Sequence, residues 1–145
     1  MTTVLRLEIV GNEESSLTTE IKSLYIPAYF GDANILEQHL PYLTLLKLGE
    51  LRYVDLNDKV FHYVVEDGFV KNENNEIVVL SETIQSGVSL IPVEEEIKNK
   101  LKETKELIEK AKHDFETAKK LERLLYDEKK YLIQLSVIEK TKKAK

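Results

Sequence analysis

The 145-residue sequence contains no cysteine and no tryptophan. Without cysteine the chain can form no disulfide, no thiolate metal site and no thiol nucleophile. No apolar run approaches the roughly 18 residues that a membrane-spanning helix needs. The first residues, MTTVLRLEIV, lack the basic region and small-residue cleavage site of a secretory signal. These absences predict no direct membrane insertion and, as the default, a cytoplasmic location.

Glycine and proline are scarce and unevenly placed. Only five glycines and three prolines occur, and none of them follows Pro92. The charge is uneven as well, because residues 1–91 carry 6 basic and 14 acidic side chains whereas residues 92–145 carry 15 basic and 12 acidic ones. This asymmetry predicts two parts with different surfaces. The acidic first part is a poor binder of nucleic acid, so no nucleic-acid partner is expected.

The first part has the pattern of a sandwich of short strands. In residues 4–10, Leu5, Leu7 and Ile9 alternate with polar side chains, as in a half-buried strand. Further strands are predicted at 18–26, 51–55 and 60–65, and a hairpin joins 69–71 to 76–80. Turns are predicted at 11–16, 56–58 and 66–68. Short strands at this spacing are typical of a β-sandwich, here placed at residues 1–88.

The second part, residues 91–145, has the pattern of amphipathic helix. Pro92 suits a first helical turn, and the three glutamates that follow it favour the positive end of a helix dipole. His113 and Asp114 mark the best break, since Asp114 is a good N-cap. Spacing alone leaves one long helix and two helices equally open. The predicted apolar positions are Ile97, Leu101, Thr104, Ile108, Ala111, Phe115 and Ala118, then Leu121, Leu124, Leu125, Leu132, Leu135 and Ile138.

No set of side chains predicts catalysis. His39 has Asp32 and Glu37 nearby in sequence, but a general base also needs an orienting partner. The three histidines, His39, His62 and His113, lack metal-ligand spacing. We therefore expect a non-catalytic protein with no cofactor and no metal. Residues 31–52 instead predict a long shaped connection, the kind of segment that contacts partners.

This connection resembles the characteristic loop of the epsilon subunit of bacterial F-type ATP synthases. Asn34 stands where that family usually has a second glycine, and Glu37-Gln38 replaces its Pro-Gly pair. The resemblance continues in order at Phe61-His62-Tyr63, Gly68, Val79–Thr83 and Val137–Lys143. The residues of the loop in register with the family are Gly31, Ile35, His39, Pro41, Leu43, Thr44, Lys47 and Gly49.

The resemblance implies an α+β fold, with an N-terminal antiparallel β-sandwich and a C-terminal α-helical hairpin. It implies a peripheral, non-catalytic central-stalk subunit of a proton-translocating synthase, on the cytoplasmic face of the inner (plasma) membrane. The sandwich would bind the gamma subunit and the membrane rotor ring. By resemblance, the residues facing the ring are Gly31, Asp32, Ala33, His39, Leu40, Pro41 and Tyr42; the alternative is that they only shape the loop.

The resemblance also implies a regulatory role for the helices. In the family they either fold against the sandwich or extend into the catalytic head and block ATP hydrolysis. The candidates for contact with acidic catalytic subunits are Lys119, Lys120, Arg123, Lys129 and Lys130. Some members bind ATP at the start of the first helix, but here Pro92 and Glu95 replace the aspartate and arginine of that motif, so we expect no useful ATP binding.

Two other interpretations of the helices remain open at this level. The helical segment could be a charged hairpin that only packs on the sandwich, or an arm that recruits a partner helix. The whole chain could correspondingly be a β-sandwich adaptor with a helical arm, unrelated to ATP synthesis. The ordered match at both ends of the chain favours the stalk subunit.

Overall fold

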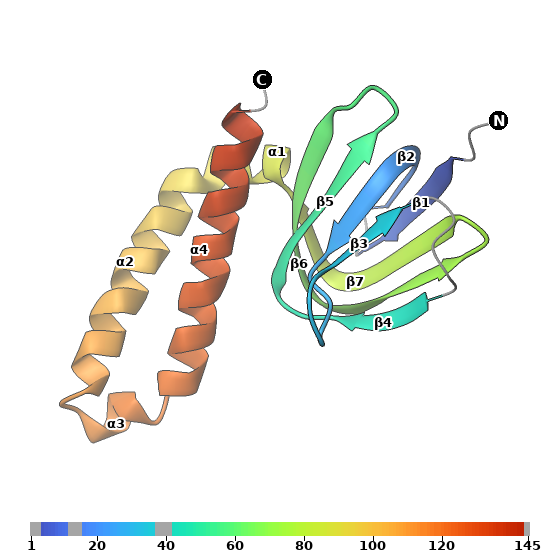
Figure 1. Cartoon of the computed structure of the whole chain (residues 1–145). Helices are drawn as coiled ribbons and strands as arrows, with labels where there is room; N and C mark the ends of the chain where they lie inside the picture. Colours follow the sequence, from blue (N-terminus) through green and yellow to red (C-terminus); the bar gives the residue numbers. More distant parts are fainter. Residues whose placement is uncertain (1–3, 12–15, 37–41, 144–145) are drawn as a thin grey trace.

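The structure, a computed structural model, describes residues 4–11, 16–36 and 42–143. Strands fill the first part of the chain and helices the second (Figure 1). The strands are β1 (Leu5–Val10), β2 (Leu17–Ile26), β3 (Ala33–Leu36), β4 (Tyr42–Leu46), β5 (Gly49–Asp55), β6 (Val60–Glu73) and β7 (Glu76–Ser86). The helical segments are α1 (Gly87–Leu90), the 3-10 turn η2 (Ile91–Val93), α2 (Glu94–Ala111), α3 (Phe115–Ala118) and α4 (Leu121–Lys143). The predicted α+β fold is confirmed.

The strands wrap into a closed sandwich. Their order is β1-β7-β6-β5-β2-β3, β4 pairs with β6, and a further pairing of β1 with β2 closes the ring. The β1–β7 pairing is parallel, whereas the other strand pairings are antiparallel. Closure leaves fewer free strand edges than an open sheet would have.

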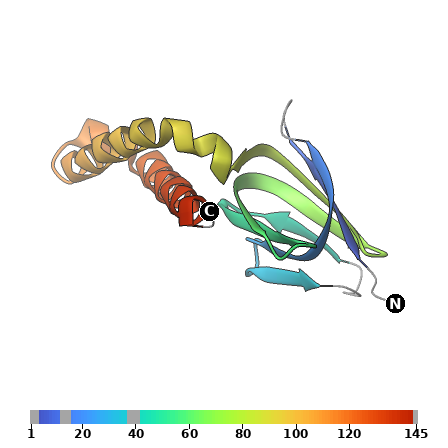
Figure 2. The same cartoon turned by 90° about the horizontal axis from the view of Figure 1, so that it is seen from above.

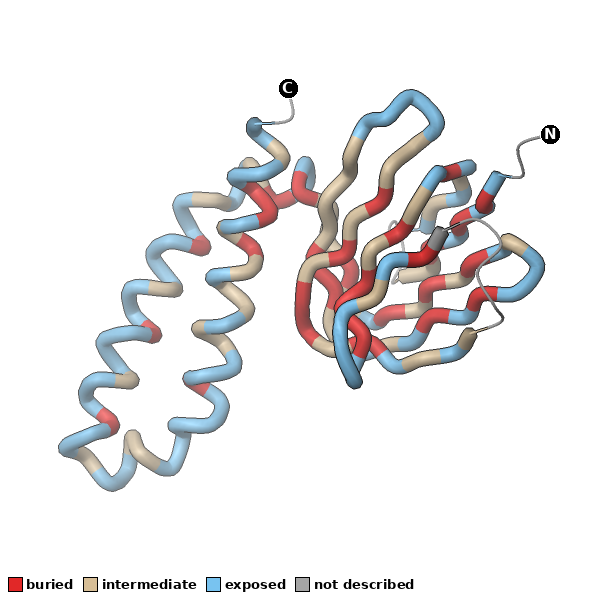
Figure 3. The backbone as a smooth tube through the Cα atoms, in the orientation of Figure 1, coloured by how far each residue is buried: buried red, intermediate tan, exposed pale blue. Residues whose placement is uncertain are grey.

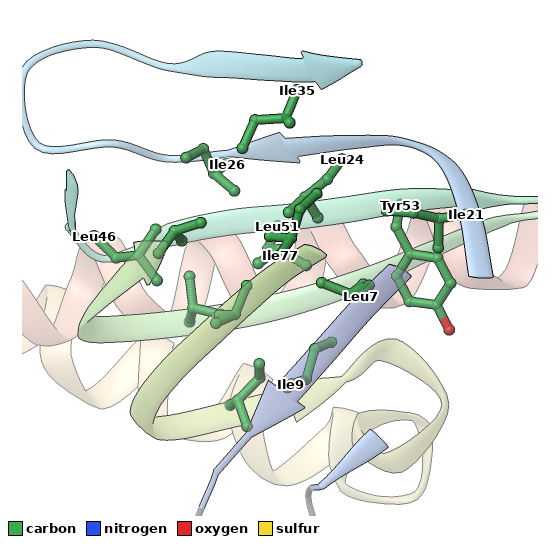
Figure 4. Packing of buried hydrophobic residues seen from close by; sticks show 14 of the residues in the cluster. Leu7, Ile9, Ile21, Leu24, Ile26, Ile35, Leu46, Leu51, Tyr53 and Ile77 are labelled. Atoms are coloured by element: carbon green, nitrogen blue, oxygen red, sulfur yellow. The ribbon is translucent and has the colours of Figure 1, made fainter. Parts of the chain in front are cut away.

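The sandwich core is built from alternating apolar positions. Leu5, Leu7 and Ile9 are at most 1% exposed, as their alternation predicts. Leu24 of β2 and Leu51 of β5 meet them from other strands (Figure 4). Each fully buried side chain of this size stabilises the fold by about 1.5–3 kcal/mol.

The segment predicted as one long connection contains two strands. Ala33–Leu36 pairs with β2, and Tyr42–Leu46 pairs with β6. The reason is visible in β4, where Leu46 is buried and Leu43 and Leu45 are exposed, so the strand alternates. Residues 37–41 between the two strands lie outside the described residues.

The turn predicted at Glu66–Gly68 is wrong, because β6 runs unbroken through it. Val65 before this point and Val70 after it both face the core, an odd separation that shifts the alternation by one residue. β6 and β7 curve together here (Figure 1), so the polar run Glu66-Asp67-Gly68 forms a corner of the sandwich. A Cβ added to Gly68 would lie 1.9 Å from the carbonyl oxygen of Leu80, so only glycine fits at the corner.

The helices form a hairpin, with α4 lying between α2 and the sheet (Figures 1 and 2). Asp114 caps α3 by accepting a hydrogen bond from the Glu116 N–H at 3.1 Å, so the break predicted at His113–Asp114 is confirmed. Pro92 lies in η2 and Glu94–Glu96 form the first turn of α2, also as predicted.

A second, smaller core joins the hairpin to the sandwich. Val64 of β6 and Leu48 pack there against Val137 and Ile138 of α4. Most of the hairpin surface is exposed in the tube coloured by burial (Figure 3). The described helices include none that is long and apolar enough to cross a membrane.

Some residues of the predicted apolar stripe of the helices are buried, and others are exposed. Ile97, Thr104 and Ala111 of α2 and Leu124 and Ile138 of α4 are buried, as predicted. Phe115, however, is 75% exposed, because it begins the short α3 at the tip of the hairpin. Three leucines of α4 are also exposed, at 37%, 48% and 47%: Leu121, Leu125 and Leu132.

Candidate partner-binding surfaces

An exposed apolar patch lies at one end of the sandwich. Leu43 and Leu45 point outward from β4, and Phe69 of β6 pairs with Leu45 in the strand register. Phe30 is 91% exposed, and its ring stacks edge-on against Tyr29 at 5.4 Å between centroids. Phe30, Leu43, Leu45 and Phe69 line one shallow hollow. Clustered exposed apolar side chains of this kind mark protein interaction sites.

Asp32 lies directly after this patch and is held by two partners. The Tyr25 hydroxyl donates a hydrogen bond to Oδ2 of Asp32, and Lys47 Nζ lies 3.7 Å from Oδ1. The guanidinium of Arg52 stacks 3.8 Å above the Tyr25 ring. The hydrogen bond to Asp32, together with burial, raises the pKa of Tyr25. Two side chains therefore hold the carboxylate of Asp32 at a defined place on the surface.

The predicted rotor-facing residues have different surroundings. Gly31 and Asp32 are exposed, and Gly31 has φ +135°, a conformation that favours glycine. Ala33 and Tyr42 are half-buried and pack against the sandwich core. His39, Leu40 and Pro41 lie outside the described residues.

Sequence reasoning did not single out the apolar patch. Its signals were present, since Tyr29-Phe30 is an aromatic pair immediately before Gly31. The sequence places Leu43 and Leu45 in the predicted connection over residues 31–52, where no inward and outward faces are defined. Once the segment is recognised as β4, both leucines belong to its outer face.

A second candidate surface is the cleft between the sandwich corner and the hairpin. It is lined by carboxylates including Glu66 and Asp67 and by the cations Lys119, Arg123 and Lys130. Three of the five predicted inhibitory cations are therefore brought together here. Lys120 and Lys129 are exposed, and no ion pair of either is found in the described part of the chain.

Lys130 contributes to a cluster centred on Glu66. Lys130 Nζ lies 3.1 Å from Oε2 of Glu66, and the Tyr126 hydroxyl donates to Oε1 at 2.6 Å. Burial alone would raise the pKa of Glu66, but the hydrogen bonds from Tyr126 and Lys130 outweigh it and lower that pKa. Burial and the bond to Glu66 raise the pKa of Tyr126.

A similar cluster centres on Glu50 at the other end of α4. Lys140 Nζ lies 2.6 Å from Oε2 of Glu50, and His62 Nδ1 lies 2.6 Å from Oε1. Burial opposes ionisation of Glu50, yet the bonds from Lys140 and His62 lower its pKa. His62 thus faces away from the sandwich core and towards the helices, as its alternation with Phe61 and Tyr63 predicts.

Further close contacts join α4 to the end of β7 and to α1, beside the apolar core of Val64 and Val137. Gln134 of α4 donates a hydrogen bond to Oε1 of Gln85 at 3.0 Å. Gly87 approaches Thr141 so closely that an added Cβ would lie 1.8 Å from Thr141 Oγ1. The hairpin is therefore docked along the length of α4 rather than at one point.

Two of the three histidines lie in described parts of the chain. His113 follows α2 at an exposed helix end, and His62 is tied to Glu50. Among the described residues, no group of three or more His, Cys, Asp or Glu side chains is placed to hold a metal ion.

Solved structures share this arrangement of sandwich and helices. A chain of the mitochondrial ATP synthase of Euglena gracilis, in a structure of its OSCP, F1 and c-ring, superposes with a TM-score of 0.66 at 15% identity. The match covers 99% of this chain and 82% of that chain. At this identity the likeness concerns the fold alone.

Sequence relatives match a little over half of the chain. The ATP synthase epsilon chain of Desulforamulus reducens is 39% identical over 80 residues, covering 55% of this chain and 60% of the relative. That of Nitratidesulfovibrio vulgaris (strain DP4) is 32% identical over 81 residues, covering 56% and 60%. The chain thus spans less than two thirds of the length of these relatives.

The family model described as the beta-sandwich domain of the ATP synthase delta/epsilon chain matches residues 4–87. That range contains the seven described strands and the apolar patch. With more than half of its length matched, the chain belongs to the ATP synthase delta/epsilon family.

Proposed function

We propose that the chain is a non-catalytic epsilon-type subunit of the rotating central stalk of a proton-translocating F-type ATP synthase. Residues 1–88 would join the stalk, and residues 91–145 would regulate it. The observation that carries the proposal is the exposed apolar patch beside Gly31 and Asp32, on a sandwich that matches this family. The family match argues against an adaptor unrelated to ATP synthesis.

The patch and the loop would serve two neighbouring partners. We assign the gamma subunit to the apolar patch, because burying Phe30 and three neighbouring apolar side chains suits a lasting protein contact. We assign the rotor ring to the loop, where Asp32 offers a fixed negative charge to basic ring loops. Residues 39–42 would complete the ring contact. Rotation of the ring would then reach the catalytic head through this joint.

The helices would restrain ATP hydrolysis when they leave the sandwich. Leu121, Leu125 and Leu132 already form an exposed stripe on α4, which a helix of the stalk could cover. The candidates for contact with the acidic catalytic subunits are Lys119, Lys120, Arg123, Lys129 and Lys130. No residue of the chain would take part in bond making.

The first test measures assembly. Phe30→Ser combined with Leu45→Ser removes apolar area that is already exposed, so the stability of the free chain should change little. Binding to a gamma subunit–rotor ring complex should weaken by about tenfold or more. The matched control is Leu56→Ser, an exposed leucine in the β5–β6 turn, away from the patch. Equal binding by the patch variant and the control would contradict the assignment.

The second test measures regulation. Glu50→Cys and Lys140→Cys can be joined by a short, reducible thiol crosslinker, because the chain has no cysteine of its own. A catalytic head stripped of this subunit should bind the crosslinked chain without being inhibited. Reduction should restore inhibition of ATP hydrolysis. A crosslinked chain that inhibits as well as the reduced one would show that the helices need not leave the sandwich.

A further inference from the structure

Glu66 is the point at which the sandwich holds the tip-proximal half of α4. It lies at the corner of β6, and its side chain is only 15% exposed. Tyr126 and Lys130, which bind its two oxygens, are four residues apart and so lie on one face of the helix. One carboxylate of the sandwich therefore fixes one turn of the hairpin.

Lys130 differs in this respect from the other four cations that we assign to the catalytic head. Lys119 pairs with Glu116 at 3.3 Å and Arg123 with Asp127 at 3.3 Å, both within the hairpin. These pairs would persist if the hairpin moved as a unit. Among the ion pairs that these five cations form in the described part of the chain, only that of Lys130 joins the hairpin to the sandwich.

Undocking would therefore change Lys130 more than its neighbours. Its side chain is 27% exposed in the docked arrangement, and on undocking the ammonium would lose its carboxylate partner and become available to another acidic surface. Glu66 in turn would keep its place on β6 without a cation. Lys130 therefore favours the arrangement, docked or extended, in which it has the stronger acidic partner.

We propose that Glu66 sets how firmly the hairpin stays docked, by holding Lys130, a cation that the extended hairpin would present to the catalytic head. The inference rests on the proposed function for its second half, but its first half concerns the free chain alone. Glu66 and the acidic surface of the head thus compete for the same lysine. Removal of Glu66 and removal of Lys130 should both loosen docking, but removal of Lys130 also removes the cation that the head would bind and should therefore inhibit less well than removal of Glu66.

Docking is measured on the free, full-length chain. Spin labels on Glu8→Cys in β1 and Ser136→Cys in α4, both exposed positions, report the distance between sandwich and hairpin. Glu66→Gln and Lys130→Met should each lower the ratio of docked to undocked chain by about fivefold to tenfold, as expected for loss of a charge-assisted hydrogen bond. Circular dichroism shows whether each variant keeps its fold.

Two matched controls separate the specific pair from a general change of charge. Asp67→Asn removes one negative charge from the neighbouring, exposed position on β6. Lys129→Met removes one positive charge from the neighbouring, exposed position on α4. Neither should shift the distance distribution. The exchange Glu66→Lys with Lys130→Glu should recover part of the docking that either single reversal loses.

Inhibition is then measured on the stripped catalytic head. Glu66→Gln should inhibit ATP hydrolysis at about a fivefold lower concentration than the parent, because less free energy is needed to undock. Lys130→Met should inhibit at a higher concentration than Glu66→Gln, although both undock. If the two variants inhibit alike, the competition for Lys130 is refuted.

The outcomes separate this inference from the proposed function. An unchanged distance distribution in Glu66→Gln, or an equal shift in Asp67→Asn, overturns the role of Glu66 whatever the head does. If neither parent nor variants inhibit hydrolysis while Glu66→Gln undocks, the inhibitory function fails and the docking role of Glu66 stands.

Discussion

Lys140 of α4 and Glu50 of β5 are ninety residues apart in the chain, yet the ammonium and the carboxylate lie 2.6 Å apart. The second oxygen of Glu50 is taken by His62, so the carboxylate has a partner from each part of the molecule. Glu50 is 14% exposed at its side chain. The contact thus links the sandwich to the last turns of α4.

Lys140→Met should weaken docking of the hairpin by about 1–2 kcal/mol, because it leaves Glu50 with one partner fewer. The methyl signals of Val64, which is buried between sandwich and hairpin, can report the docked fraction by NMR. Lys143→Met is the matched control, since Lys143 pairs only with exposed Glu139 at 3.0 Å among the described residues. Equal effects of the two substitutions would contradict a specific role of Lys140.

Docking should weaken in acid. The pKa values of Glu50 and Glu66 lie below the ordinary value of 4.5 when the hairpin is docked. A carboxylate whose pKa is lowered by docking stabilises the docked form at every pH above its ordinary pKa. This stabilisation is lost as the pH falls through the lowered pKa. Val64 methyl signals followed from about pH 7 to about pH 3 should show undocking only below 4.5. In a Glu50→Gln, Glu66→Gln double variant this acid transition should largely disappear.

Gly87→Ala should undock the C-terminal end of α4 without unfolding the sandwich. The added Cβ would lie 1.8 Å from Thr141 Oγ1 and 2.9 Å from Thr141 Cβ, so the helix has to move away. Adding Thr141→Ala removes the closer of these contacts and should recover part of the docking. The readout is the Val64 methyl signal together with circular dichroism. If Gly87→Ala and the parent have the same docked fraction, α4 can shift at this point without a loss of docking free energy.

Gly68→Ala should destabilise the sandwich itself, by about 2–4 kcal/mol. Its Cβ would meet the Leu80 carbonyl oxygen at 1.9 Å, and that oxygen is backbone and cannot turn aside. Gly31→Ala is the comparison, because an added Cβ there meets nothing within 4 Å and only the φ of +135° opposes it. Urea unfolding should show a loss of about 1–2 kcal/mol for Gly31→Ala. A larger loss there than at position 68 would contradict the close approach to Leu80.

The chain should not bind ATP usefully at the start of α2. Glu94, Glu95 and Glu96 form the first helical turn, and Glu94 is already paired with Lys142. Three carboxylates there would repel a triphosphate, which needs cations or free N–H groups. Titration calorimetry with ATP should give no binding heat in the micromolar range. A Glu95→Arg variant, which restores the cation of the family motif, tests whether charge alone decides the outcome.

The sequence predicts well those parts of the fold in which one face of an element is buried. The alternation of Leu5, Leu7 and Ile9 places β1 correctly, and Asp114 correctly marks the break between the helices. The run Glu66-Asp67-Gly68 misleads, because a strand corner and a turn both need polar residues and a glycine. The feature that sets this corner apart is the close approach of Gly68 to the backbone of Leu80 on another strand, which the local sequence does not reveal.

The candidate surfaces were predictable only in part. The resemblance pointed to Gly31 and Asp32, which are exposed beside the apolar patch. It could not reveal that Leu125 of α4 stays exposed while Leu124 is buried, because both fit one apolar stripe. Pairing of Lys130 with Glu66 joins positions 64 residues apart, and no local pattern encodes such a contact.

The corner of β6 carries both an anchor of the hairpin and part of the apolar patch. Phe69 of the apolar patch follows Glu66 by three residues on the same strand. β4, β5 and β7 bond to β6 along its length, and the backbone of Leu80 lies close to Gly68, between these two residues. A mechanical load that a rotating partner applied at Phe69 would be transmitted to the anchor of the hairpin without a hinge in between. Under the proposed function, β6 would thus couple the torque on the stalk mechanically to the release of the helices.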